Sequence, residues 1–203
     1  GLVMAKTRSY DYTPPTYDSL KGMADNKGSM FDSLFKDVKF YRPKQGNNFL
    51  RILPPGWKGA THYGLFIWVH SNVGPKDRQY LCNKENKDSP HKICPICDEL
   101  YKLGPRATQQ DKTDLSPSQR VAYYVIDRDN EKDGVQLWLA SATTNSEVAA
   151  QSIDDRNGSA LDIVHPEHGY DIEFSRTGTS RNNTRYRGFK VARNESPLSD
   201  SDR

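Results

Sequence analysis

Residues 70–97 read HSNVGPKDRQYLCNKENKDSPHKICPIC and contain every cysteine of the chain, Cys82, Cys94 and Cys97. Two residues separate Cys94 from Cys97, a spacing that lets the backbone turn and direct both sulfurs to one point. Cys82 precedes this pair by twelve positions, and His70 precedes Cys82 by another twelve. Three thiolates and one imidazole form a ligand set that suits a closed tetrahedral zinc site. The pattern predicts a structural zinc ion that holds this polar segment together.

Other interpretations of these residues fit the sequence less well. An odd number of cysteines would leave one thiol over in a disulfide framework, and a redox C-x2-C pair expects a βαβ context that does not follow. His62 and His91 compete with His70 as the fourth ligand. His91 lies three residues before Cys94, where chelation would be cramped. We favour His70 because it ends the apolar run 65–69, a predicted strand that would hold the ligand rigidly.

Composition sets the limits on size and class. The 203 residues suffice for one domain, or for one domain with an insertion. Hydrophobic residues make up 34% and charged residues 27%, and the mean hydropathy is −0.86, which predicts a modest core with many loops. A net charge of +3 does not by itself indicate a polyanionic partner. The absence of a membrane-spanning run and of a secretory signal, together with free thiols, favours a reducing cytosol and no membrane partner.

Strand patterns dominate the chain after residue 37. The predicted strands are residues 49–53, 65–69, 121–126, 135–139, 170–176 and 185–193. We expect strands 121–126 and 135–139 to form one hairpin, and strands 170–176 and 185–193 to form another. Short helices are predicted within 17–36, at 98–103 and at 146–153, and residues 106–119 are expected to be a polar loop. The pattern predicts a mainly β fold with short helices. A five-stranded Greek-key barrel of the oligonucleotide-binding (OB) type fits it, and so does a β-sandwich.

We divide the chain into three parts. Residues 1–36 form an N-terminal arm with short helices, and residues 37–193 form the OB-type core. The zinc-binding subdomain, at about 62–104, is inserted into this core. Residues 194–203 form a C-terminal tail.

The final predicted hairpin concentrates positive charge. The span 176–193 contains no Asp or Glu, and its cations are Arg176, Arg181, Arg185, Arg187, Lys190 and Arg193. Tyr186 and Phe189 are interleaved with these cations. Cations that follow phosphates and rings that stack on bases are what single-stranded nucleic acid requires. The alternative is a solvated basic hairpin whose aromatic residues belong to the core.

Further basic and aromatic residues extend the predicted contact surface. Tyr123 and Tyr124 should point to opposite faces of their strand. If Leu137 and Leu139 face the core, Trp138 faces outward as a stacking platform. The complete predicted set of DNA contacts is Arg51, Tyr80, Tyr101, Lys102, Arg106, Arg120, Tyr123, Tyr124, Trp138, Arg176, Arg181, Arg185, Tyr186, Arg187 and Lys190.

Enzymatic function is not expected. A zinc deaminase needs H-x-E followed by P-C-x-x-C. Residues 165–167 match the first element but come after the cysteines, and the second element does not occur. The phosphate-binding pattern G-x-x-x-x-G-K-[ST] is also missing from the sequence.

The runs FLRILP at 49–54 and LFIWVH at 65–70, followed by Cys82 and the Cys94–Cys97 pair, resemble the core of the T-even phage single-stranded DNA-binding proteins. The resemblance covers about residues 5–193. It implies an OB barrel with a His-Cys-Cys-Cys zinc subdomain. It also implies sequence-independent binding of single-stranded DNA during replication, recombination and repair, in the cytoplasm of an infected bacterial host.

The resemblance implies partners as well. Lys6-Thr7-Arg8-Ser9 is similar to the family's motif for head-to-tail cooperativity, so the N-terminal arm is expected to bind a second copy along the strand. The family recruits replication proteins through an acidic tail, of which residues 199–203 carry only a trace. The alternative function is a zinc-stabilised protein-interaction adaptor, or an RNA-binding module.

Overall fold

The computed structural model describes residues 39–55, 62–73, 78–87, 89, 92–180 and 183–200. The N-terminal arm, the helices predicted within 17–36, and Arg181 lie outside these residues. The elements are β1 Lys39–Phe40, β2 Gly46–Ile52, β3 Leu65–Val73, β4 Arg78–Leu81, α3 Pro95–Leu103, η1 Gly104–Arg106, α4 Gln109–Leu115, β5 Ser118–Asp127, η2 Glu131–Asp133, β6 Val135–Ser141, α5 Ala142–Gln151, β7 Ile153–Asp154, β8 Ser159–Ala160, β9 Tyr170–Thr177 and β10 Arg185–Glu195.

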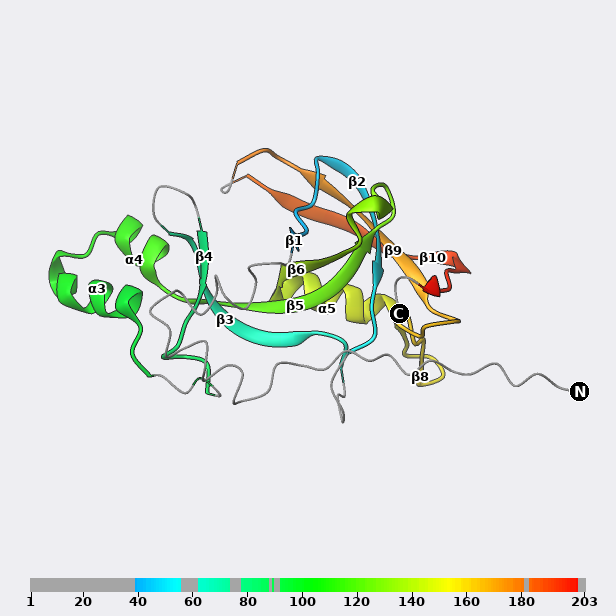
Figure 1. The fold of residues 1–203 in the computed structure, drawn as a ribbon, viewed down its shortest axis with the longest axis horizontal. Coiled ribbons are helices and arrows are strands. Elements are labelled where there is room, and N and C mark those ends of the chain that lie inside the picture. Colours follow the sequence, from blue (N-terminus) through cyan, green and yellow to red (C-terminus); the bar gives the residue numbers. More distant parts are fainter. Residues whose placement is uncertain are drawn as a thin grey trace, which may run out of the picture.

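The described chain is mainly β, with three short α-helices. Its main sheet has eight strands and runs in the order β1-β6-β5-β2-β9-β10. β3 pairs with β5 and β4 pairs with β3, so β5 contacts β6 along one edge, and β3 and then β2 along the other. Among the described residues, no strand pairing closes this sheet into a barrel. In Figure 1, α3, α4 and β4 lie at one end of the long axis, and the base of the β9–β10 hairpin lies toward the other.

Both predicted hairpins are present. β5 and β6 pair antiparallel from Arg120–Ser141 to Ile126–Val135. β9 and β10 also pair antiparallel, with Tyr186 opposite Arg176. The helix expected at 146–153 begins earlier, as α5, because the Ser141 side chain caps it by accepting from the Thr144 amide.

The prediction of a polar loop at 106–119 is wrong. Residues 109–115 form α4, which has no buried residue and therefore no apolar stripe to reveal it. A capping box starts this helix, because the Thr108 hydroxyl accepts from the Asp111 amide and the Asp111 carboxylate accepts from the Thr108 amide. Local hydrogen bonds thus form a helix that hydrophobic periodicity does not predict.

The core is built on a row of rings. Trp138 stacks on Phe174 with centroids 5.3 Å apart, and Phe174 stacks on Phe189 with centroids 4.9 Å apart. Trp138 is only 3% exposed, so the prediction that it faces outward is wrong. Leu137 is buried as well, because this part of the sheet is covered on both faces. Tyr123, also fully buried, packs against Trp138 from β5.

A bulge in β10 keeps Phe189 in this row. Gly188 and Phe189 lie together opposite Phe174, between the paired residues Arg187–Ser175 and Lys190–Glu173. Gly188 has φ of +69°, a conformation that glycine adopts without strain. The inner face of β10 therefore carries Phe189, and Arg187 and Lys190 remain exposed.

Arg51 is fully buried, so the prediction that it contacts DNA is wrong. Its guanidinium donates to four backbone carbonyl oxygens, those of Ser196, Ile52, Ile163 and His165. Burial lowers the pKa of Arg51 to about 10, which leaves it charged at neutral pH. Its role is to connect β2 to the turn before β9 and to the segment after β10.

The turn around Arg51 has room for no larger residue than glycine. A Cβ on Gly169 would lie 2.2 Å from Nη2 of Arg51 and 2.5 Å from the His165 carbonyl oxygen. Leu198 is buried nearby, and its amide donates to the Pro166 carbonyl. The segment 196–198 is therefore part of the packed structure.

In the part of the chain that the structure describes, every helix is too short or too polar to cross a bilayer.

Candidate metal centre and neighbouring cleft

The four predicted metal ligands come from three neighbouring elements. β3 supplies His70, Cys82 follows directly after β4, and Cys94 and Cys97 lie at the N-cap and in the first turn of α3. Pro95 favours the helix start, because proline has no amide hydrogen and the first helical position needs none. We call β4, α3, η1 and α4 together the metal lobe.

Hydrogen bonds from backbone amides and from the Asn86 side chain hold the loop after Cys82 in place. The Cys82 amide donates to the Trp68 carbonyl at 2.9 Å. The Asn86 side chain accepts from the Trp68 amide and donates to the carbonyls of Trp68 and Cys82. These bonds join the loop to β3, the strand that carries His70.

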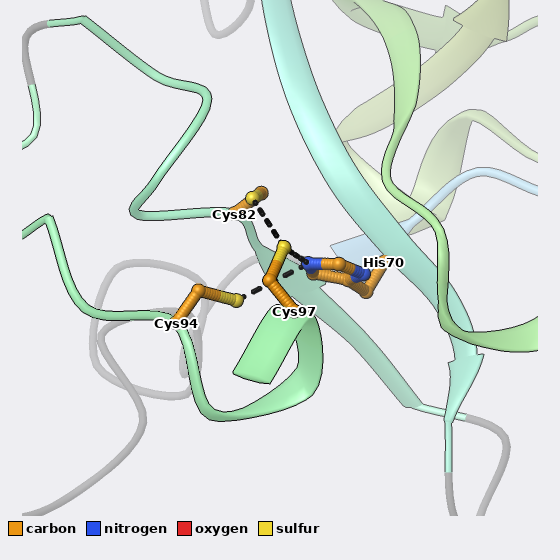
Figure 2. A group of neighbouring side chains, drawn as sticks. All are labelled: His70, Cys82, Cys94 and Cys97. Carbon is orange, nitrogen blue, oxygen red and sulfur yellow. Dashed lines mark hydrogen bonds between the residues drawn. The ribbon is translucent and has the colours of Figure 1, made fainter. Parts of the chain in front are cut away.

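The ligand atoms converge on one point (Figure 2). Nε2 of His70 lies 3.2 Å from Sγ of Cys94 and 3.5 Å from Sγ of Cys97, and the sulfurs of Cys82 and Cys97 are 3.6 Å apart. All four ligand atoms lie within 4.8 Å of one another. A tetrahedral zinc ion would separate two sulfurs by about 3.8 Å, and a sulfur from a nitrogen by about 3.6 Å. The four side chains therefore lie close enough to bind a metal ion, with spacings compatible with zinc.

The competing histidines are not part of this group. Nδ1 of His62 accepts from the Gly64 amide, and its ring stacks on Tyr63. His91 lies outside the described residues. The choice of His70 over His62 is supported by the geometry.

The electrostatics of the cluster fit a cation. Burial raises the pKa of the Cys82 and Cys97 thiols and lowers the pKa of the His70 imidazole. Nδ1 of His70 is buried and has no hydrogen-bond partner of normal geometry among the described residues, although the Leu115 backbone interacts with the ring and partly offsets the lowering of its pKa. Without a metal, the cluster would hold two buried thiols, one half-buried thiol and a buried neutral ring with few polar partners. A divalent cation would stabilise the thiolates, and four protein ligands would leave no open position for catalysis.

An open cleft of ≈ 580 Å³ lies between the β9–β10 hairpin, β6, α5 and the segment after β1. Three arginines line it, Arg42, Arg176 and Arg185. Rings line it too: Phe40 and Tyr186 are half-buried, and Tyr41, Trp138 and Phe189 are buried. Glu147 of α5 is the one carboxylate among the described residues that line it.

Arg176 fixes the hairpin over this cleft. Its Nη1 donates to the Pro43 carbonyl at 2.6 Å, which joins β9 to the segment that carries Arg42. Its Nη2 lies 3.5 Å from the Thr184 hydroxyl across the hairpin. Arg176 thus both positions the cleft wall and contributes charge to it.

No family model matches the chain, and no curated protein matches it. The function of the chain is therefore inferred from the metal cluster and the cleft.

The structure divides the predicted DNA contacts into separate groups. Arg176, Arg185, Tyr186 and the edge of Trp138 line the cleft, and Arg120 lines a second pocket next to it. Tyr80, Tyr101, Lys102 and Arg106 belong to the metal lobe, where Tyr101 is 85% exposed. Arg187 and Lys190 lie on the outer face of β10, and Lys190 pairs with Glu173.

Two of the remaining predicted contacts are in the core, and the third, Tyr124, is half-buried against it. Arg51 is fully buried. So is Tyr123, whose hydroxyl bonds Asn145, so the prediction that it contacts DNA is also wrong. Tyr124 packs beside Leu53 and Leu198.

Most of the residues that line the cleft were not among the predicted contacts, and Arg42 and Gln79 are the two that add a cation and an amide. Arg42 reaches the cleft because β1 pairs in parallel with β6, a contact between segments almost a hundred residues apart. Gln79 reaches it from β4 in the metal lobe. A cation next to a proline in Arg42-Pro43 was a visible signal, but the sequence does not place it opposite the hairpin.

Proposed function

We propose that this protein binds single-stranded DNA without sequence preference, through the cleft between the β9–β10 hairpin and β6. The observation that carries the proposal is the lining of that cleft, which combines three arginines with two half-buried rings, Phe40 and Tyr186, and three buried rings. The arginines can neutralise the phosphates of a bound strand, and unpaired bases can stack on the flat faces of the rings. A double helix has its bases stacked inside and would use only the cations.

The strand arrangement supports an OB-type assignment for the core. The strands β6, β5, β2, β9 and β10 are consecutive in the sheet, and each pairs antiparallel with its neighbour. The two outer strands of this set, β6 and β10, form opposite walls of the cleft. OB folds are partly open five-stranded barrels that bind oligonucleotides on one face.

The proposal includes a structural zinc ion at His70, Cys82, Cys94 and Cys97. When bound, zinc would join β3, the end of β4 and the start of α3, and so hold the metal lobe against the sheet. The biological setting we propose is phage DNA replication, recombination and repair, with no covalent chemistry.

Titration with oligo-dT at two salt concentrations, followed by Tyr and Trp fluorescence, tests the proposal. We expect steeply salt-dependent binding and quenching. Arg185→Gln should lower the salt slope by about 0.7, the share of one phosphate contact on a single strand. Arg193→Gln is the matched control, because it removes the same charge from an exposed position on the same strand outside the cleft.

Tyr186→Leu tests the stacking part of the proposal. The loss of one base–ring stack should weaken binding by about 1–3 kcal/mol with an unchanged salt slope. An RNA competitor, oligo-U, separates a DNA-binding from an RNA-binding module. Salt-independent association, or none, would contradict the proposal and favour the alternative of a protein-interaction adaptor.

A further inference from the structure

A second, smaller pocket of ≈ 200 Å³ lies where the metal lobe meets the sheet. Its lining is almost entirely polar, with four hydroxyls, one amide and one guanidinium, from Ser71, Thr113, Ser116, Ser118, Gln79 and Arg120. Among the described residues that line it, Leu139 is the one apolar residue and none carries a carboxylate. We call this the junction pocket.

The donor set of the junction pocket suits an anion with several oxygens. Hydroxyl and amide groups can each donate a hydrogen bond, and a guanidinium adds a fixed positive charge. The Thr113 hydroxyl already donates to the Gln109 carbonyl, and Nη1 of Arg120 donates to the Gln119 carbonyl. Hydrogen bonds to an anion are therefore assigned to the three serine hydroxyls and the Gln79 amide, with Arg120 contributing its charge. Contacts of this kind, from Ser, Thr, Gln and Arg side chains, are those that proteins make with the phosphates of nucleic acids. The lining offers no ring for a base to stack on.

The junction pocket is continuous with the cleft under the hairpin. Gln79 and Leu139 line both of them. A chain of phosphates that leaves the cleft beside Leu139 therefore meets the junction pocket next.

We infer that the junction pocket binds a backbone phosphate of the same DNA strand that occupies the cleft. This inference rests on the proposed function and extends it, because it gives the DNA strand a path from the hairpin past Gln79 of β4 to α4. The binding surface then includes two walls of the metal lobe, β4 and α4, in addition to the sheet.

The metal site and the junction pocket share their supporting strand. His70 and Ser71 are successive residues of β3, so their side chains point to opposite faces, one to the cysteines and the other to the pocket. α4, which carries Thr113, packs against both α3 and β3. Metal binding would therefore position one wall of the pocket, although the metal itself would not contact the DNA strand.

The test places a negative charge in the pocket. Ser118→Asp adds a carboxylate where the phosphate would lie, and Ser118→Asn adds a neutral side chain of the same size. Gln119→Glu is the charge control, because Gln119 is exposed on the opposite face of β5 and lines neither cavity. Binding of oligo-dT of about 4 and about 12 nucleotides is measured, lengths that span the range for one OB fold.

We expect Ser118→Asp to weaken binding of the longer oligonucleotide by about fivefold or more, the repulsion of two charges about 4 Å apart in water. The shorter oligonucleotide would occupy only the cleft and not the junction pocket, so its affinity should fall by less than about twofold. Ser118→Asn and Gln119→Glu should each change either affinity by less than about twofold. Metal removal should likewise weaken the longer oligonucleotide more than the shorter one.

If Ser118→Asp and Gln119→Glu weaken the affinity for the longer oligonucleotide equally, the inference is overturned. The proposed function would still stand in that case, provided that the wild-type protein binds oligo-dT. No binding of either length by the wild type would remove both. Inorganic phosphate tests the other source of the same chemistry, through amide NMR shifts of Ser118. Saturable shifts below about 1 mM phosphate without a length-dependent effect of Ser118→Asp would assign the pocket to free phosphate and overturn the path.

Discussion

Replacing Arg51 with methionine tests whether this arginine serves the fold or the ligand. In the structure its guanidinium donates four hydrogen bonds to carbonyl oxygens, at 2.8, 2.8, 3.0 and 2.5 Å, to Ser196, Ile52, Ile163 and His165. Methionine has a similar length and no donor. The substitution would leave these carbonyls, which come from three separate segments, without their common partner.

The expected cost follows from those contacts. A hydrogen bond from a charged group contributes about 1.5–3 kcal/mol, and the effects at one side chain are not additive. Removal of one partner from a buried charged network typically costs about 3–5 kcal/mol. We therefore expect Arg51→Met to lower the free energy of unfolding by about 3–5 kcal/mol. In urea, with a slope of about 2 kcal/mol/M, the midpoint would fall by about 1.5–2.5 M.

Arg156→Met is the control, because Arg156 is exposed in the turn between β7 and β8 and should change stability by less than about 0.5 kcal/mol. Folded Arg51→Met protein should bind oligo-dT with the wild-type salt slope. The reasoning would be refuted by a variant of near-wild-type stability whose salt slope falls by about 0.7, since that would make Arg51 a phosphate contact.

Two further predictions concern the metal lobe and the far end of β10. Chelation of the metal should increase amide hydrogen exchange throughout α3 and α4 while β9 keeps its protection; equal increases in all three would contradict a local role. The hydrogen bond and charge of Glu195 raise the pKa of His168 above its ordinary value of 6.5. The ion pair therefore stabilises the folded protein fully at pH values below the pKa of His168 in the unfolded chain. This stabilisation is lost as the pH rises through the pKa of His168 in the folded protein. NMR titration should show the raised pKa, and Glu195→Gln should return it toward 6.5.

The metal cluster could be predicted from the sequence because its information is local. The spacing Cys94-x2-Cys97 and the strand that ends at His70 are both visible in short windows, and the structure brings these residues together with Cys82. Strands with clear apolar alternation were found for the same reason. α4 was missed because its stability comes from the Thr108–Asp111 capping box and not from an apolar face.

The orientation of single side chains was harder to predict. Period-2 alternation assigns the faces of a strand only where one face is wet, and Trp138 lies where both faces are covered. Arg51 looked like a surface cation because arginine is seldom fully buried. Its four carbonyl partners come mostly from segments more than a hundred residues away, which no sequence window contains.

The bulge at Gly188 has a consequence for how the hairpin is aimed. An extra residue in one strand increases the local twist and bends that strand. Gly188 lies between the base of the hairpin, where Phe189 is anchored in the ring stack, and the outer half that carries Arg185 and Tyr186. This single backbone position therefore governs the aperture between the hairpin and β6. Substitutions there could widen or narrow the entrance while every group that lines it stays the same.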